Sequence, residues 1–207
     1  VMFVARALRP MLATAAMRRA CTRTLCASPR VMRPTSQPTL SFDPSVKTAM
    51  DKQEPPAPGA DFRVVIVGAG NINFGSDEGP WNHSFRLEHK LGPRLKVVAL
   101  IDPDAERARR VLQTKCQSFV LSAYKDTVVY PTFKDYMASV CAETYPHAVW
   151  VGSPPAFRGG TEPGRNLEQL LTAGLPNVPL FIEKPVSTGA VDQTFEVAKM
   201  LEQNGSL

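Results

Sequence analysis

A glycine-rich turn is the first group of residues in this chain whose types and spacing suit a chemical task. Gly68 and Gly70, separated by one alanine, follow a β-branched run at 63–67. A glycine at 68 allows a tight turn, and a glycine at 70 lets the backbone come close to a pyrophosphate group. Backbone N–H groups at a helix start then hold the phosphate charge, which adds Asn71 and Ile72 to the candidate set. The turn therefore predicts a binding site for a dinucleotide.

The residues after this turn depart from the usual dinucleotide fingerprint. Asn73 stands where a third glycine is expected, and the turn-forming stretch 75–80 delays the next predicted helix, which lies around 83–91. Either the helix start is displaced or a longer loop covers the phosphates. An ordinary glycine turn that joins a strand to a helix is the alternative interpretation, and this motif alone leaves it open.

Asp102 is the second candidate, at the carboxyl end of a predicted strand at 96–101. A carboxylate at that place can accept hydrogen bonds from both hydroxyls of an adenosine ribose, and it would repel a 2′-phosphate. NAD is therefore favoured over NADP, although Arg107 is near enough in sequence to reach a 2′-phosphate. The spacing from Gly68 is 34 residues, lengthened by the stretch after the glycine turn. In the simpler interpretation, Asp102 caps a helix that begins at Pro103.

Two turns that contain proline close two further predicted strands. The first consists of Ser153, Pro154 and Pro155, and the second of Glu183, Lys184 and Pro185. In open α/β sheets, ligands bind in the crevice outside the carboxyl ends of the strands. Each turn closes a predicted buried strand, which makes it a candidate for this edge of the sheet.

Apolar runs alternate with amphipathic segments from about residue 61 onward. The predicted strands are 63–67, 96–101, 127–130, 148–152 and 180–183. The predicted helices are 83–91, 102–117, 133–140, 165–173 and 191–204. This alternation, with strands buried on both faces, is typical of an α/β fold with a doubly wound parallel sheet. We therefore expect residues 61–207 to form a nucleotide-binding domain with the Rossmann fold.

Residues 1–60 differ in composition from the rest of the chain. Residues 1–42 contain seven arginines, no lysine and no acidic residue, and a proline-rich stretch at 54–59 precedes the first strand. We expect this part to be a disordered basic leader and linker. Two interpretations stay open: a mitochondrial presequence, with the protein in the matrix, or sequence upstream of a start at Met32 or Met50, with the protein in the cytoplasm.

The leader also accounts for the positive charge of the chain. The formal net charge of +5 comes from 24 basic and 19 acidic residues, and 17 basic residues remain without the leader arginines. The remaining net charge of about −2 takes away the main support for nucleic-acid binding. The four cysteines lack metal-ligand spacing, so no metal is expected. The apolar runs are too short to cross a bilayer, so no membrane partner is expected either.

Taken together and in this order, the four motifs resemble those of the Gfo/Idh/MocA oxidoreductases, from about residue 63 to 207. That family has a glycine turn, a strand-ending acid, a Thr-Pro-Pro-like turn after strand four and a Glu-Lys-Pro motif after strand five. The resemblance implies that the last two face the nicotinamide. The resemblance implies that Lys184 is the catalytic residue at the reacting oxygen, beside the nicotinamide. The chain departs from the family at Asn73 and at Arg158, where many members have a histidine.

The resemblance also implies a function and a missing part. Family members continue into a sixth strand and an α/β domain that binds the substrate and supports homo-oligomers, and we expect this chain to lack that domain. The implied function is NAD(P)-dependent hydride transfer to or from a small sugar-like or polyol substrate in the full-length architecture. The chain alone is expected to be inactive, which makes a non-catalytic dinucleotide-binding or regulatory module the main alternative.

Two further interpretations carry less weight. A methyltransferase-like domain that holds S-adenosylmethionine would also use the glycine turn and the acid, but it gives no reason for the two proline-containing turns. The three histidines, His83, His89 and His147, have no ligand or triad spacing. We expect them to be surface or capping residues.

Overall fold

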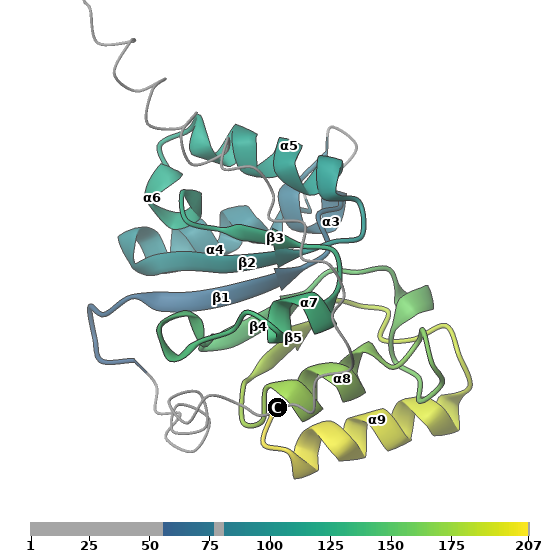
Figure 1. Cartoon of the computed structure of the whole chain (residues 1–207). Helices are drawn as coiled ribbons and strands as arrows, with labels where there is room; N and C mark the ends of the chain where they lie inside the picture. The colour runs from purple at the N-terminus through teal and green to yellow at the C-terminus, as the bar shows by residue number, and fades with distance from the viewer. Residues whose placement is uncertain (1–55, 77–80, 207) are drawn as a thin grey trace, which may run out of the picture. The chain divides into compact units, whose positions relative to one another are not determined.

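The apolar runs of the sequence form one sheet, as the computed structural model in Figure 1 shows for residues 56–76 and 81–206. The strands are β1 (Phe62–Val67), β2 (Leu95–Ile101), β3 (Val128–Tyr130), β4 (Ala148–Val151) and β5 (Leu180–Ile182). Their order in the sheet is β3-β2-β1-β4-β5, and every neighbouring pair is parallel. This arrangement confirms the predicted doubly wound α/β fold. The expected leader at 1–42 lies outside the described residues.

Helices connect the strands and cover both faces of the sheet (Figure 1). They are α3 (Asn71–Phe74), α4 (His83–Leu91), α5 (Ala105–Cys116), α6 (Leu121–Tyr124), α7 (Phe133–Met137), α8 (Leu167–Gly174) and α9 (Val191–Gln203), with short 3₁₀ turns η1 (Gly92–Arg94), η2 (Ala142–Thr144) and η3 (Pro155–Phe157). The helices α4, α5 and α6 lie on one face, and α7, α8 and α9 lie on the other.

The central strand β1 contributes side chains to both faces because neighbouring residues of a strand point in opposite directions. Val65 and Val67 pack with Leu171 of α8 in one hydrophobic core. Val64 and Ile66 point to the opposite face and are at most 1% exposed. Burial on both faces explains the uninterrupted β-branched run, and it places the end of β1 in the middle of the edge where ligands bind.

Two helix boundaries differ from the prediction by three residues, and the other differences are of one or two residues. The helix α5 begins at Ala105, because the Asp104 side chain caps it by accepting a hydrogen bond of 2.9 Å from the Arg107 backbone N–H. The predicted helix start at 102 is therefore wrong, and so is the alternative interpretation in which Asp102 caps a helix beginning at Pro103. The helix α7 ends at Met137, three residues earlier than predicted.

The glycine turn leads directly into a short helix that the sequence analysis missed. This four-residue helix, α3, follows Gly70 and ends at Gly75. The long helix α4 then begins at His83, as predicted, after Asn82, whose side chain accepts a 2.9 Å hydrogen bond from the Phe85 N–H. The stretch after the turn thus separates a short helix at the crevice from the long helix that packs on the sheet.

Candidate functional site

A pocket of about 320 Å³ lies at the carboxyl ends of β1, β2, β4 and β5. Its lining residues are Gly68, Gly70, Asn71, Ile72, Asp102, Arg107, Gly152, Ser153, Pro154, Pro155, Arg158, Glu183 and Lys184. The structure therefore brings together in one pocket every candidate residue of the sequence analysis except Pro185. That proline is exposed and follows Lys184 through a cis peptide bond.

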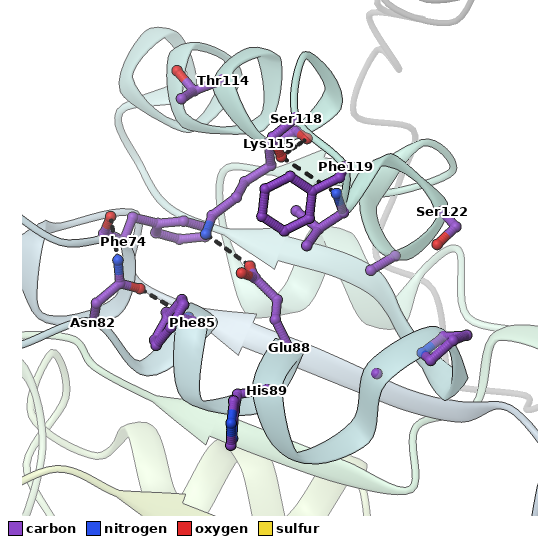
Figure 2. Close-up of a pocket in the computed structure, with 14 residues that line it drawn as sticks. Phe74, Asn82, Phe85, Glu88, His89, Thr114, Lys115, Ser118, Phe119 and Ser122 are labelled. Carbon is purple, nitrogen blue, oxygen red and sulfur yellow. Dashed lines mark hydrogen bonds and ion pairs between the residues drawn. The ribbon is translucent and has the colours of Figure 1, made fainter.

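A larger pocket of about 640 Å³ lies elsewhere, between α4 and the segment from α5 to α6 (Figure 2). Figure 2 shows Phe74, Phe85 and Phe119 around it, together with the Lys115–Glu88 ion pair of 2.7 Å. The candidate residues of the sequence analysis do not line this pocket. The chemistry of the lining residues, rather than pocket size, therefore identifies the candidate site.

The two glycines of the turn are required for different reasons. Gly68 has a φ of +97°, and a Cβ atom there would lie 3.1 Å from Gly152 C and Ser153 N. The fold itself therefore requires glycine at 68. Gly70 has an extended backbone, with φ −81° and ψ 177°, and beyond its two chain neighbours no described atom lies within 4 Å of a Cβ built on it. Glycine at 70 thus leaves open space in the pocket, which fits a ligand that approaches the backbone closely.

Asn73 fills the place of the missing third glycine and is fully buried. Its Nδ2 donates hydrogen bonds to Val67 O at 3.1 Å and to Gly68 O at 2.7 Å. A Cβ on Gly152 would collide with the Asn73 side chain. In this chain, Asn73 and Gly152 together achieve the close packing of the turn against the neighbouring strand that a third glycine usually allows.

Asp102 is 3% exposed and accepts three hydrogen bonds. Its Oδ2 accepts from Ala69 N at 2.6 Å, and its Oδ1 accepts from Asp104 N and from Arg107 Nη2, both at 2.8 Å. An ionised carboxylate has about four acceptor sites, so one remains for a ligand hydroxyl. The side chain therefore fits a ribose hydroxyl, while the Arg107 guanidinium offsets its negative charge.

Arg158 ties the two proline-containing turns together. The side chain is 1% exposed, and its nitrogens donate to Ser153 O at 2.9 Å, to Val186 O at 2.9 Å and to Glu183 O. Burial lowers the pKa of Arg158, and the carboxylates of Glu168 and Glu183 oppose that effect. Arg158 is thus a structural clamp that joins the two turns.

Glu168 of α8 lies on the other side of this clamp and is fully buried. Its Oε2 accepts a 2.7 Å hydrogen bond from the Gly159 N–H. Burial raises the pKa of Glu168, and the hydrogen bond from Gly159 and the charge of Arg158 lower it to a smaller extent. A buried acid and a buried base therefore support the turn that carries Ser153.

The Glu183 side chain is held by His83, a residue that was expected to lie on the surface. His83 is 2% exposed, and its Nε2 lies 2.5 Å from Glu183 Oε2, so the expectation that His83 is a surface or capping residue is wrong. His83 opens α4, and Leu87 and Leu91 follow it at intervals of four residues. That spacing places the three side chains on one helix face. Because two of the three are leucines, the spacing predicts that this face, and His83 with it, is buried. His89 is exposed, as expected.

Lys184 extends from this turn into the pocket and is exposed. Its Nζ lies 5.0 Å from the centre of the Trp81 ring, within the range of a cation–π interaction. An exposed amine at the pocket edge is in a position to contact the reacting oxygen of a bound molecule. Lys184 and Asp102 thus lie at opposite ends of the pocket, with the glycine turn between them.

The described residues contain neither a metal-binding cluster nor a membrane-spanning helix. No group of three or more His, Cys, Asp or Glu side chains there could hold a metal ion. No helix in the described part of the chain is long and apolar enough to cross a membrane.

Two curated proteins are similar to this chain over part of their length. Two uncharacterized proteins of Schizosaccharomyces pombe are 42% identical to this chain over 147 residues and 37% identical over 158 residues. These matches cover 70% and 75% of this chain, but only 38% and 39% of the two relatives. The chain therefore spans less than half the length of the curated relatives that it matches.

Two solved structures also resemble the chain. The WlbA dehydrogenase from Bordetella pertussis, crystallised with NADH and UDP-GlcNAcA, matches with a TM-score of 0.50 at 14% identity, over 70% of this chain and 34% of its own. The WlbA dehydrogenase from Chromobacterium violaceum, in complex with the same two ligands, gives a TM-score of 0.49 at 16% identity, over 73% of this chain and 35% of its own. At these identities the likeness concerns the fold alone.

The family assignment rests on the sequence. The profile of the Gfo/Idh/MocA family, described as an oxidoreductase family with an NAD-binding Rossmann fold, matches residues 62–207. The match includes all four motifs and more than half of the chain. The chain therefore belongs to the Gfo/Idh/MocA oxidoreductase family and carries its NAD-binding Rossmann fold.

Proposed function

We propose that the pocket binds NAD(H), with the pyrophosphate over the turn from Gly68 to Gly70 and the adenosine ribose beside Asp102. The strand order supports this placement, because β2 and the β4–β5 pair lie on opposite sides of β1. A dinucleotide centred on the end of β1 therefore extends toward Asp102 on one side and toward Lys184 on the other. The nicotinamide half then lies at Ser153, Pro154 and the Glu183-Lys184-Pro185 turn.

In the whole protein, we propose hydride transfer between this nicotinamide and a small sugar-like or polyol substrate. The bound nicotinamide would accept or supply the hydride. Lys184 would contact the reacting oxygen and assist the loss or return of its proton. A second domain would hold the substrate, supply the partner of Lys184 and support a homo-oligomer.

The open space beside Gly70 is the observation that carries the proposal. Its extended backbone is accessible to any residue, and the protein places no atom within 4 Å of a Cβ at this position. The packing of the protein therefore does not require glycine at 70, whereas a pyrophosphate at the turn does. This separates Gly70 from Gly68, which the fold requires in any case.

The substitution Gly70→Val tests the proposal directly. We expect the NADH affinity, measured by titration calorimetry, to fall by at least about tenfold, because the side chain would occupy the place of the pyrophosphate. The free energy of unfolding should change by less than about 0.5 kcal/mol, since nothing in the protein contacts the new side chain. Gly68→Val is the matched comparison and should destabilise the fold itself. Unchanged NADH affinity in a folded Gly70→Val variant would contradict the proposal.

Cofactor binding and turnover need separate assays, because a non-catalytic binding module is the main alternative. NADH binding by the 207-residue chain without any oxidation of polyols is the result expected if the partner residues lie outside it. Full turnover by this chain alone would contradict the role given to a second domain.

A further inference from the structure

His83 and Glu183 form a buried contact between segments that are 100 residues apart in the chain. His83 begins α4, and Glu183 directly follows β5. The imidazole ring also lies 5.3 Å from the rings of Trp150 and of Phe181, measured between centroids. Contacts with β4, with β5 and with the residue that follows β5 therefore hold the imidazole in one orientation, with Nε2 against the Glu183 carboxylate.

Glu183 is thereby fixed at two points. Arg158 binds its backbone carbonyl, and His83 binds its side chain. The next residue is Lys184, whose own side chain is exposed and has the ring of Trp81 as its neighbour. Because the carbonyl and the carboxylate of Glu183 are both held, the backbone at Glu183 has little freedom. The direction of the Lys184 side chain is restricted as a result.

The other ring nitrogen of His83 makes no hydrogen bond to the described residues, so the contact with Glu183 is the polar contact of this side chain. Within the described part of the chain, the buried Nδ1 of His83 has no hydrogen-bond partner. Leaving a buried polar atom unpaired destabilises the folded state, so an apolar ring would suit this place better if packing were the only role. The contact with Glu183 is therefore the feature that distinguishes a histidine here from a phenylalanine or leucine.

We propose that His83 is a positioning residue for the nicotinamide end of the site: by holding Glu183, it sets the placement of Lys184 in the pocket. The inference rests on the proposed function, because it assigns the Lys184 end of the pocket to the nicotinamide. The first residue of α4 would then help to shape the Lys184 end of the pocket, although α4 follows the glycine turn in the sequence. The adenosine end, where Asp102 lies, does not depend on this contact.

The test compares two probes in the 207-residue protein. NADH occupies both ends of the site, whereas ADP-ribose carries the adenosine and pyrophosphate but has no nicotinamide. We expect His83→Ala to weaken NADH binding by about fivefold or more and to change ADP-ribose binding by less than about twofold. His83→Gln can still donate a hydrogen bond to Glu183 and should restore most of the NADH affinity. His89→Ala, at an exposed histidine of the same helix, is the matched control and should change neither affinity.

A second measurement does not need the cofactor. Acetylation of lysines, followed by mass spectrometry, gives the labelling rate of Lys184 relative to Lys199, an exposed lysine of α9. In wild type we expect Lys184 to react more slowly than Lys199, because its amine is held near Trp81. In His83→Ala the ratio should approach one, and in His83→Gln it should stay at the wild-type value. This readout remains available if NADH fails to bind to wild type, which would contradict the proposed function alone.

Three results would overturn the positioning role. Equal losses of NADH and ADP-ribose affinity in His83→Ala would show a general structural effect. An unchanged NADH affinity and an unchanged Lys184 labelling ratio would show that the contact does not place Lys184. If His83→Ala does not fold, His83→Leu provides the same comparison with a filled core, and wild-type affinity and labelling in that variant would equally exclude the proposal.

Discussion

The two ends of the pocket are held by different kinds of contact. At the Asp102 end, the carboxylate is bound by two backbone N–H groups, of Ala69 and Asp104, and by one side chain from the helix that follows. At the Lys184 end, Glu183 is held by the side chains of Arg158 and His83, which come from other segments of the chain. Backbone turns thus shape the first end, and long buried side chains shape the second. Single substitutions should therefore damage the second end more.

The largest expected difference between the two ends concerns their arginines. Arg158→Met removes a buried guanidinium and leaves three carbonyl oxygens and the Glu168 carboxylate without it. We expect the free energy of unfolding to fall by about 3–5 kcal/mol, the usual cost of breaking a buried charged cluster. Arg107→Met at the other end should cost about 1 kcal/mol or less, because the Arg107 side chain is 44% exposed. Urea denaturation of both variants measures the two values, and equal losses would contradict the comparison.

Cofactor choice should depend on the Asp102 end alone. Asp102→Ser removes the acceptor for a ribose hydroxyl and the repulsion of a 2′-phosphate, while Arg107 stays available for that phosphate. The ratio of NAD affinity to NADP affinity should fall by about tenfold, equivalent to about 1.4 kcal/mol. Calorimetric titration of both dinucleotides tests this. Arg107→Met should raise this ratio, because it removes the cation that would bind the 2′-phosphate. An unchanged ratio in Asp102→Ser would show that Asp102 only accepts hydrogen bonds from the backbone of the glycine turn and does not select the cofactor.

The smallest expected effect is a pH dependence of stability at the Lys184 end. Burial raises the pKa of Glu168 in the folded protein, so the folded state favours the protonated acid. Its contribution is fully present below the ordinary carboxyl pKa and is lost as the pH rises through the raised value. Glu168→Gln keeps the acceptor for the Gly159 N–H but does not titrate. The variant should therefore lose less stability than wild type when the pH rises from 4 toward neutrality, as urea denaturation over this range would show. A parallel pH dependence in the two proteins would exclude Glu168 as its source.

All five predicted strands are present within about one residue of their expected ends, because each is an apolar run between turns. The central strand β1 gave the strongest signal, since it is buried on both faces and therefore needs a continuous β-branched run. The short helices α3 and α6 were missed, since four residues provide too little periodicity to distinguish a helix from a turn. The start of α5 was placed too early because two acids compete for the cap, and only the structure shows that Asp104 provides it.

The sequence by itself determined the candidate site to the extent that the site is built from backbone geometry. Glycine at a tight turn, an acid at the end of a strand and prolines after strands are local features, so their positions along the chain were enough to predict that they meet at one edge of the sheet. Only the tertiary structure decided what supports them. These supports are the contacts of His83 with Glu183, of Arg158 with both proline-containing turns and of the Asn73 side chain with Gly152, which follows β4. Such contacts depend on distances in space between segments far apart in the sequence. The four-residue spacing of His83, Leu87 and Leu91 shows that His83 faces inward, but it does not name Glu183 as the partner.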